Sequence, residues 1–202
     1  MEMARLRATD TLLVTSAAGG VGSAAVQLGV KLGARVIGAA SRGKQQAIRD
    51  LGAHLALDYD DLARELAARP GEVNVVLDMA GGAVYRTALR HLAPMGRLVL
   101  AGASDAFPRT RNPLARLAAL RDLPRAGIFD MLRRSYGVMS FHVGWLLAAG
   151  AVRPQWQELI RFAEEHRLAP VVGHELAFEE IGDAHRLLEE RRNVGKVVVH
   201  VY

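Results

Sequence analysis

Residues 11–27 read TLLVTSAAGGVGSAAVQ and change character twice within this short stretch. The apolar run at 11–15 is typical of a buried strand, and a turn of small residues follows it at once. From residue 20 to residue 32 apolar side chains recur every three or four positions, which predicts one face of a helix. The members of that face are Val21, Ala25, Leu28 and Leu32. The stretch therefore predicts a strand, a tight turn and a helix in direct succession.

Strand and helix patterns alternate along the rest of the chain. Strands are predicted at 35–40, 54–57, 73–78, 97–101, 137–143, 171–176 and 196–201. Helices are predicted at 44–51, 58–69, 83–92, 155–167 and 178–190, with an interrupted helical pattern at 114–134. Repeated strand–helix units with continuous apolar strands favour a parallel sheet with right-handed crossovers. We therefore expect an α/β fold, a Rossmann-type doubly wound and mostly parallel six-stranded sheet with helices on both faces, as one domain over 1–202 with a lead-in at 1–10.

The small-residue turn meets the requirements of a dinucleotide site. Such a site needs a sharp turn, a close approach of backbone to pyrophosphate and tight helix–strand packing, which G-x-G-x-x-G usually supplies. Here Ala17 stands in the place of the first glycine, while Gly19 and Gly22 keep the second and third. An ordinary tight connection could use the same residues. The position between the first strand and an amphipathic helix, whose N-terminus can face phosphates, favours nucleotide binding.

The segment after the second strand indicates which dinucleotide is bound. An NAD site places Asp or Glu about 20 residues beyond the turn to bind the ribose hydroxyls. Residues 36–46 contain no carboxylate, and Ser41, Arg42 and Lys44 stand there instead. Charge-assisted hydrogen bonds contribute about 1.5–3 kcal/mol each, so two of them, discounted for solvent exposure, would favour a 2′-phosphate by about tens- to thousands-fold. The alternative is a solvated first turn of the second helix. The residues favour NADP(H) as cofactor.

Composition argues against several other classes of protein. The net charge of +5 comes from 26 basic and 21 acidic residues that are interspersed, so we expect no nucleic-acid partner. The chain has no cysteine, which excludes disulfides and thiolate chemistry within it and is compatible with the cytoplasm, where we expect it. Residues 135–152 lack Lys, Arg, Asp and Glu, but they include His142 and internal glycines. A strand followed by a short helix explains this stretch better than a membrane span.

The sequence contains no independent catalytic or metal-binding motif. It has neither G-x-S-x-G nor H-E-x-x-H, and its seven histidines lack the spacing of metal ligands. We therefore assign no catalytic residue and no metal site. His142 is expected to supply backbone groups rather than a proton, and Asp78 is expected to be a hydrogen-bonded structural carboxylate rather than a general base.

Several words of the sequence, in order, carry a family resemblance. They are TLLVTSAAGGVGSAAVQLG, LGARVIGAASRGK, LGAHLALDY, NVVLDMAGG, LAPMGRLVLAG, FHVGWL and RRNVGKVVV. Together they resemble the medium-chain dehydrogenase/reductase superfamily in its zinc-free, quinone-oxidoreductase-like branch. The last two words are also similar to the subgroup of vesicle amine transport protein 1 homologues.

The resemblance implies a set of contacts to the cofactor. The turn would line the pyrophosphate, and residues after the second strand would meet the 2′-phosphate. Tyr59 would lie beside the adenosine phosphate, unless it is an ordinary boundary aromatic, and Asn193 would close over the cofactor, unless it only forms a turn. The residues implied are Ala18, Gly19, Gly20, Val21, Ser41, Arg42, Lys44, Tyr59, Met79, Gly102, Ala103, Phe141, His142, Val143 and Asn193. Of these, Met79 would lie near the nicotinamide ribose, and 141–143 would offer backbone groups to the carboxamide.

The resemblance also implies an activity, and it implies that these residues form only part of the enzyme. The leading interpretation is the NADPH-binding domain of a reductase that transfers hydride to a quinone or another electron-poor C=C. Family members carry an N-terminal GroES-like domain that forms the other wall of the substrate cleft, and we expect that domain to be absent from these residues. The alternatives are an enoylreductase domain of a polyketide synthase, in which Lys44 matches a proposed proton donor, and a non-catalytic NADPH sensor.

The expected partners are a small-molecule substrate and a second copy of the chain. The family commonly dimerises through the strand that follows the long insertion, here 137–143. An apolar edge strand has unpaired backbone groups that favour pairing with another strand. The resemblance therefore predicts a homodimer across this edge.

Overall fold

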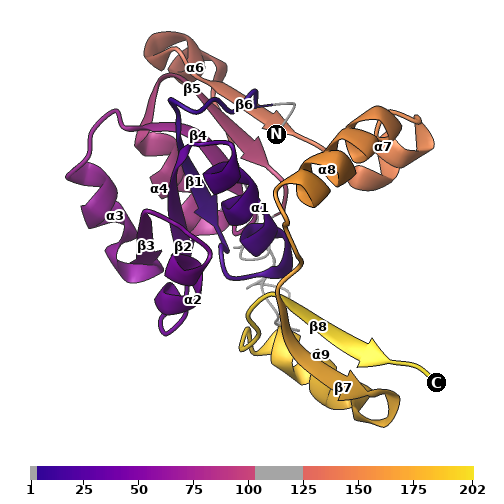
Figure 1. The fold of residues 1–202 in the computed structure, drawn as a ribbon. Coiled ribbons are helices and arrows are strands. Elements are labelled where there is room, and N and C mark those ends of the chain that lie inside the picture. Colours follow the sequence, from indigo (N-terminus) through magenta and orange to yellow (C-terminus); the bar gives the residue numbers. More distant parts are fainter. Residues whose placement is uncertain (1–3, 103–124) are drawn as a thin grey trace, which may run out of the picture.

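The structure, a computed structural model, describes residues 4–102 and 125–202 and has a six-stranded sheet at its centre (Figure 1). The strands are β1 (Thr11–Thr15), β2 (Arg35–Ala40), β3 (Leu55–Asp58), β4 (Val73–Asp78), β5 (Leu92–Leu100) and β6 (Gly137–Ser140). All neighbours pair in parallel, in the order β3-β2-β1-β4-β5-β6. This confirms the predicted Rossmann-type fold. The order reverses between β1 and β4, where a ligand crevice forms in such sheets.

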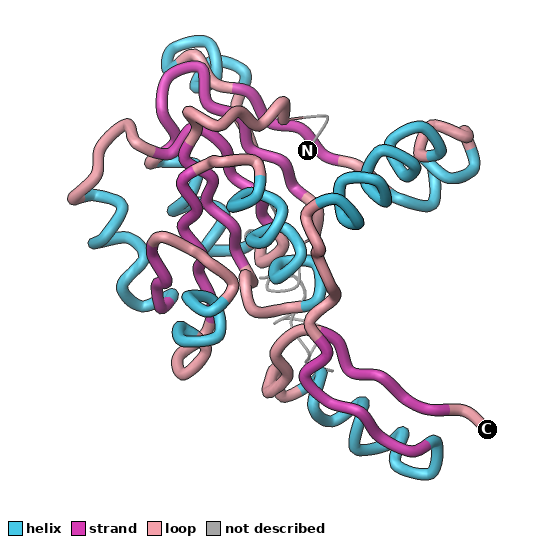
Figure 2. The backbone as a smooth tube through the Cα atoms, in the orientation of Figure 1, coloured by secondary structure: helices cyan, strands magenta, loops and turns pink. Residues whose placement is uncertain are grey.

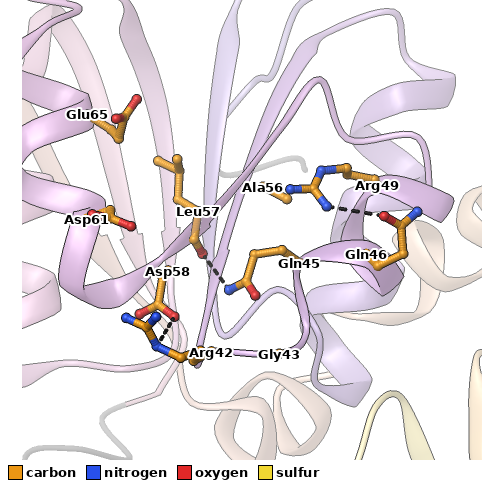
Figure 3. Close-up of a pocket in the computed structure, with 10 residues that line it drawn as sticks. All are labelled: Arg42, Gly43, Gln45, Gln46, Arg49, Ala56, Leu57, Asp58, Asp61 and Glu65. Carbon is orange, nitrogen blue, oxygen red and sulfur yellow. Dashed lines mark hydrogen bonds and ion pairs between the residues drawn. The ribbon is translucent and has the colours of Figure 1, made fainter.

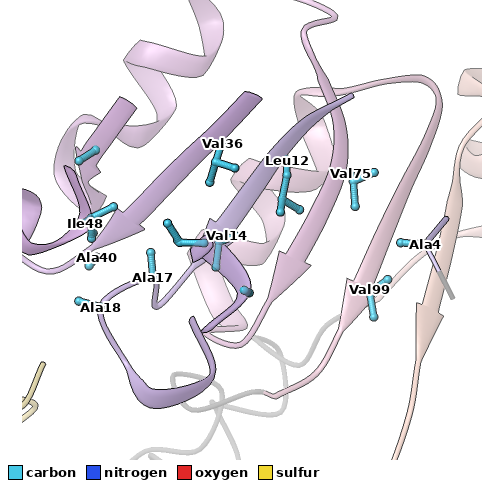
Figure 4. Close-up of a cluster of buried hydrophobic side chains, with 13 residues drawn as sticks. Ala4, Leu12, Val14, Ala17, Ala18, Val36, Ala40, Ile48, Val75 and Val99 are labelled. Carbon is cyan, nitrogen blue, oxygen red and sulfur yellow. The ribbon is translucent and has the colours of Figure 1, made fainter. Parts of the chain in front are cut away.

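Helices cover both faces of the sheet because successive strand residues point to opposite sides. Leu12 and Val14 belong to the apolar cluster shown in Figure 4, which α1 (Gly20–Lys31) and α2 (Gln45–Asp50) help to cover. Leu13, between them, belongs to a second cluster together with residues of α3 (Tyr59–Ala67) and α4 (Gly82–Arg90). The continuous apolar strands are thus buried from both sides.

The fifth strand begins earlier than the sequence predicts. Val73 of β4 pairs with Leu92, whereas Val75 pairs with Arg97, so β5 makes an irregularity between these two points. Pro94, Met95 and Gly96 lie within it, and Met95 has a φ of 61° and is exposed. The Pro-Met-Gly sequence is typical of a turn, which is why the prediction of a strand at 97–101 misses its first residues.

Four helices lie within residues 125–202, the described part of the second half of the chain. They are α6 (Ile128–Arg134), α7 (Val143–Ala148), α8 (Arg153–Glu165) and α9 (Ile181–Glu189). The end of the interrupted helical pattern forms α6, and the part of that pattern before residue 125 lies outside the described residues. The short helix predicted within the uncharged stretch is α7, and β6 ends at Ser140 rather than at residue 143. Within the described residues, no helix is long and apolar enough to cross a bilayer.

The last two strands form a separate parallel pair, β7 (Val172–Ala177) and β8 (Lys196–His200), connected by a 3-10 turn (Phe178–Glu180) and α9. This C-terminal unit, residues 172–200, projects away from the main sheet (Figure 2). The apolar face of α9 is only partly covered, since Ile181 and Leu188 are 42% and 47% exposed and Ala184 is the buried residue of this helix. Two strands are too narrow to cover the apolar face of this helix.

Candidate functional site

The turn between β1 and α1 is tight enough to need glycine. The Gly19 N–H donates to the Ser16 carbonyl at 2.9 Å, and Ser16 itself has a φ of 51°. A Cβ atom on Gly22 would lie 2.2 Å from the Ser16 carbonyl oxygen, a separation that real Cβ atoms essentially never show. The third glycine of the motif therefore has the close-packing role that the sequence predicts.

No side chain in the first turn of α1 compensates the partial positive charge at the N-terminus of this helix. That turn contains no acidic residue, and Gly19 at the N-cap offers no side chain to accept a hydrogen bond. The first amides of a helix have no partner within the helix, and the helix dipole adds partial positive charge there. This place is suited to an anion such as a pyrophosphate.

The segment 191–195, between α9 and β8, closes over this turn. The Gly195 N–H donates to the Ala18 carbonyl at 2.7 Å, and Gly19 and Gly195 form a parallel bridge. The Lys44 ammonium donates to the Asn193 carbonyl at 2.7 Å and to the Arg191 carbonyl at 2.5 Å. The structure thus brings the turn, Lys44 and Asn193 together, although they lie far apart in sequence.

Lys44 is less free than the sequence implies. Burial, and then the positive charge of Arg191, lower the pKa of its ammonium group. Both causes disfavour the charged form, and a nearby phosphate would reverse this effect. Two carbonyl oxygens at present take the hydrogen bonds that a 2′-phosphate would accept.

Carboxylates reach the end of the second strand from a neighbouring element. Arg42 pairs with Asp58 at 3.7 Å (Figure 3). It also pairs with Asp60 at 3.3 Å. Asp58 ends β3 and caps α3 by accepting a hydrogen bond from the Asp60 N–H. The field around Arg42 is therefore less positive than residues 36–46 alone indicate. The Arg42–Asp60 pair is solvent-exposed and therefore weak, whereas the Asp58 side chain is largely buried. The Arg42 side chain itself is exposed, so a phosphate could compete for it.

A cavity of about 510 Å³ lies beside these ion pairs, between α2, β3 and α3 (Figure 3). Arg42 and Arg49 line it together with three carboxylates, those of Asp58, Asp61 and Glu65. None of the residues of the glycine turn lines it. This mixed-charge cavity is therefore distinct from the predicted dinucleotide site, with which it shares Arg42.

Tyr59 supports the turn directly. Its hydroxyl accepts a hydrogen bond from the Ser16 N–H at 2.8 Å and lies 3.2 Å from the Ser16 hydroxyl oxygen. Tyr59 therefore lies beside the glycine turn, and its contact with the adenosine phosphate remains a prediction. The contact with Ser16 also gives the residue a structural role, because it holds Ser16 in its left-handed conformation.

Asp78 is a buried structural carboxylate at the end of β4. One of its oxygens accepts a 2.7 Å hydrogen bond from the Thr15 hydroxyl, and the other accepts one from the Gly81 N–H at 3.0 Å. The Thr15 hydroxyl in turn accepts from the Met79 N–H at 2.9 Å. These bonds agree with the structural role expected for Asp78. They join the carboxyl ends of β1 and β4, which flank the crevice.

The remaining predicted residues lie along the same edge of the sheet. Met79 and Gly102 are adjacent, since a Cβ on Gly102 would lie 3.1 Å from the Met79 carbonyl oxygen. Ser41 follows β2 and accepts a hydrogen bond from Gln45 through its carbonyl. Phe141, His142 and Val143 follow β6 and are exposed, and no hydrogen bond joins them to the turn within the part of the chain that the structure describes. Ala103 lies outside the described residues.

Sequence reasoning misses Lys196. A Cβ on Gly20 would lie only 2.7 Å from Lys196 Cδ, so this side chain crosses the face of the glycine turn. The signal is present, since the RRNVGK word that points to Asn193 also contains this lysine, but the apolar pattern assigns it only to the final strand. Among residues 4–102 and 125–202, His, Asp and Glu form no group of three that could hold a metal ion.

Comparisons with known proteins agree with this geometry. Residues 51–199 match the family model described as zinc-binding dehydrogenase. The chain is 35% identical over 202 residues to the spectinabilin polyketide synthase system protein NorB of Streptomyces orinoci, covering 98% of this chain and 8% of that protein. It is 32% identical to the synaptic vesicle membrane protein VAT-1 of Tetronarce californica, covering 96% of this chain and 52% of that protein.

A solved structure shares both sequence and fold. The quinone oxidoreductase of Thermus thermophilus, solved alone and in complex with NADPH, superposes with a TM-score of 0.80 at 32% identity, over 99% of this chain and 60% of that one. The chain thus spans about half the length of VAT-1, 60% of that enzyme and a small part of NorB. The parallel sheet, the glycine turn and these matches place the chain in the medium-chain dehydrogenase/reductase superfamily, in its zinc-independent, quinone-oxidoreductase-like branch.

Proposed function

We propose that the chain is the NADPH-binding domain of a reductase that transfers hydride to a quinone or another electron-poor C=C. The single observation that carries the proposal is the convergence of the uncapped α1 N-terminus, Lys44 and Asn193 on one glycine turn. Helix amides and a cation favour a ligand with two separate anionic groups. The NADPH complex of the similar Thermus quinone oxidoreductase supports this assignment.

The residues present fit such a cofactor. Gly22 allows the turn to pack closely, and Gly19 and Gly20 add no side-chain atoms of their own to its surface. Ser41, Arg42 and Lys44 lie at the end of β2 for the 2′-phosphate, and Met79 and Gly102 lie at the ends of β4 and β5 for the nicotinamide half. When bound, NADPH supplies hydride from its nicotinamide ring. The protein binds it, orients it and excludes water around it.

Calorimetric titration with NADPH and NADH tests the cofactor assignment. We expect NADPH to bind at least about tenfold more tightly, because a 2′-phosphate gains charge-assisted hydrogen bonds from Lys44 and Arg42. Lys44→Met should reduce this preference and leave NADH binding unchanged. Equal affinities for the two dinucleotides in the wild-type chain would contradict the assignment.

A second candidate is the enoylreductase domain of a polyketide synthase. The observation that favours it is the 35% identity to NorB along almost the whole of this chain. The two candidates differ in the acceptor that is reduced, an acyl thioester enoyl group or a quinone. Assays of the longest natural gene product with crotonyl thioesters and with a quinone panel would separate them. Binding of NADPH without reduction of either would favour a sensor.

We further propose that residues 1–202 alone bind cofactor with little or no turnover. In relatives of about twice this length, further residues are available to build a substrate cleft, and the resemblance implies a GroES-like domain there. A clear quinone-reductase rate from the purified chain would contradict this part. We also propose a small-molecule substrate and a cytoplasmic location. The absence of cysteine from the chain supports the location.

A further inference from the structure

Lys196 places an ammonium group at the glycine turn from the far end of the chain. A Cβ atom on Gly20 would lie 2.7 Å from Lys196 Cδ, 2.8 Å from Cε and 3.0 Å from Nζ, so the whole outer half of the side chain lies against this glycine. Gly195, its neighbour, is held to the Ala18 carbonyl by a 2.7 Å hydrogen bond. The backbone therefore fixes the root of the side chain beside the turn.

The surroundings of this ammonium group are positive. The α1 N-terminus, with no acidic residue in its first turn, begins at Gly20 itself. Lys44 approaches the same C-terminal segment at Asn193. Within the described ranges, no acidic side chain or hydrogen-bond acceptor pairs with the Lys196 ammonium group. A cation at the positive end of a helix is unfavourable, and an anion bound between them would make both charges favourable.

We propose that Lys196 is a ligand of the dinucleotide pyrophosphate, in addition to the amides of the turn. This inference rests on the proposed function. It assigns the two lysines to different groups of the cofactor, with Lys44 at the 2′-phosphate and Lys196 at the pyrophosphate. Since NADH and NADPH share the pyrophosphate, Lys196 contributes affinity for both and does not discriminate between them.

Titration of the full chain with NADPH, NADH and 2′-AMP tests this assignment. We expect Lys196→Met to weaken binding of both dinucleotides by about tenfold, the loss of one exposed charge-assisted hydrogen bond. Binding of 2′-AMP, which has a 2′-phosphate and no pyrophosphate, should be unchanged. Lys196→Arg should retain most of the affinity. The matched control is Lys31→Met, which removes an exposed lysine from the opposite end of α1 and should leave all three affinities unchanged.

Each outcome has a distinct meaning. If the wild-type chain binds neither dinucleotide, the proposed function is wrong, and this inference, which rests on it, is wrong as well. If the wild-type chain binds both and Lys196→Met binds them equally well, only the inference is overturned. A loss confined to NADPH would also overturn it, because that would place Lys196 at the 2′-phosphate. Thermal unfolding without ligand shows whether each variant is folded. If Lys196→Met is not folded, the affinities of Lys196→Arg for the same three ligands still test the inference.

Discussion

At the scale of single residues, Thr15 is the polar link between the two strands that flank the crevice. Its hydroxyl donates to Asp78 and accepts from the Met79 N–H, and all of it is buried. Thr15→Val keeps the shape but leaves a buried carboxylate oxygen and a backbone donor without this partner. We expect a loss of about 1–3 kcal/mol in the free energy of unfolding, measured by urea denaturation.

A control for this effect is Thr11→Val on the same strand. The Thr11 backbone N–H, rather than its side chain, bonds Asn74. This variant should therefore change stability little. Similar losses for both threonines would show that the strand position, and not the Thr15–Asp78 bond, determines the cost.

The glycine turn allows a second test at this scale. Gly22→Ala puts a Cβ atom within 2.2 Å of the Ser16 carbonyl oxygen, so the turn must shift. We expect dinucleotide binding to weaken by at least about tenfold, and stability to fall by about 1–3 kcal/mol through overpacking. Gly182→Ala in α9 is the matched control, because a Cβ there meets nothing within 4 Å. If Gly22→Ala bound the dinucleotide as tightly as the wild type, the proposed role of this turn in dinucleotide binding would be refuted.

At the scale of elements, the buried phenol of Tyr85 in α4 should make the free energy of unfolding decrease as pH rises in the alkaline range. It is 1% exposed, and burial, then Tyr136, then Asp78, raise its pKa to about 12. In the unfolded chain the phenol ionises near about pH 10, whereas in the folded chain it stays neutral. The stabilisation is therefore complete below about pH 10 and is lost as pH rises toward about 12, at up to about 1.4 kcal/mol per pH unit.

Urea denaturation at a series of pH values between about 8 and about 12 measures how the free energy of unfolding changes with pH. Tyr85→Phe should flatten the decline, although Tyr136, whose pKa is also raised by burial, retains part of it. Tyr202→Phe changes a fully exposed phenol and should leave the decline as it is. An identical pH profile for the wild type and Tyr85→Phe would show that the buried phenol is not its cause.

The elements also show what sequence can and cannot predict. Continuous apolar runs such as VNVVLD identify buried parallel strands, because both faces of the sheet are covered. Pro94-Met95-Gly96 hides the start of β5, because the irregularity uses residues typical of a turn. The Arg42–Asp58 pair could not be predicted from residues 36–46, since its acid comes from β3. Lys196 lies at the site only because 191–195 folds back over the turn, a contact that no local pattern encodes.

At the scale of the whole molecule, we predict a homodimer through β6. Among the strands that the structure describes, this one lies at the edge of the six-stranded sheet, the position at which a strand from another chain can pair. Light scattering should give about twice the chain mass of 21.9 kDa. Ser140→Lys adds a charge to an exposed position of this edge and should shift the protein toward the monomer. A wild-type monomer at high concentration would contradict the prediction.

The C-terminal unit has a partly exposed apolar face. Val172, Phe178, Ile181 and Leu188 are between 42% and 50% exposed there. Such a concentration of large apolar side chains is typical of an interaction surface.

The bond between Gly195 and Ala18 has a consequence for biosynthesis. A ribosome releases the chain from its N-terminus, and the first strands can assemble while later residues are still being added. The predicted phosphate site, however, joins the turn at 17–20 to a segment that is synthesised more than 170 residues later. Nascent protein would therefore gain full cofactor affinity only after Gly195 has been added, and a messenger cut short before the codon for Gly195 would yield the sheet without the complete nucleotide site.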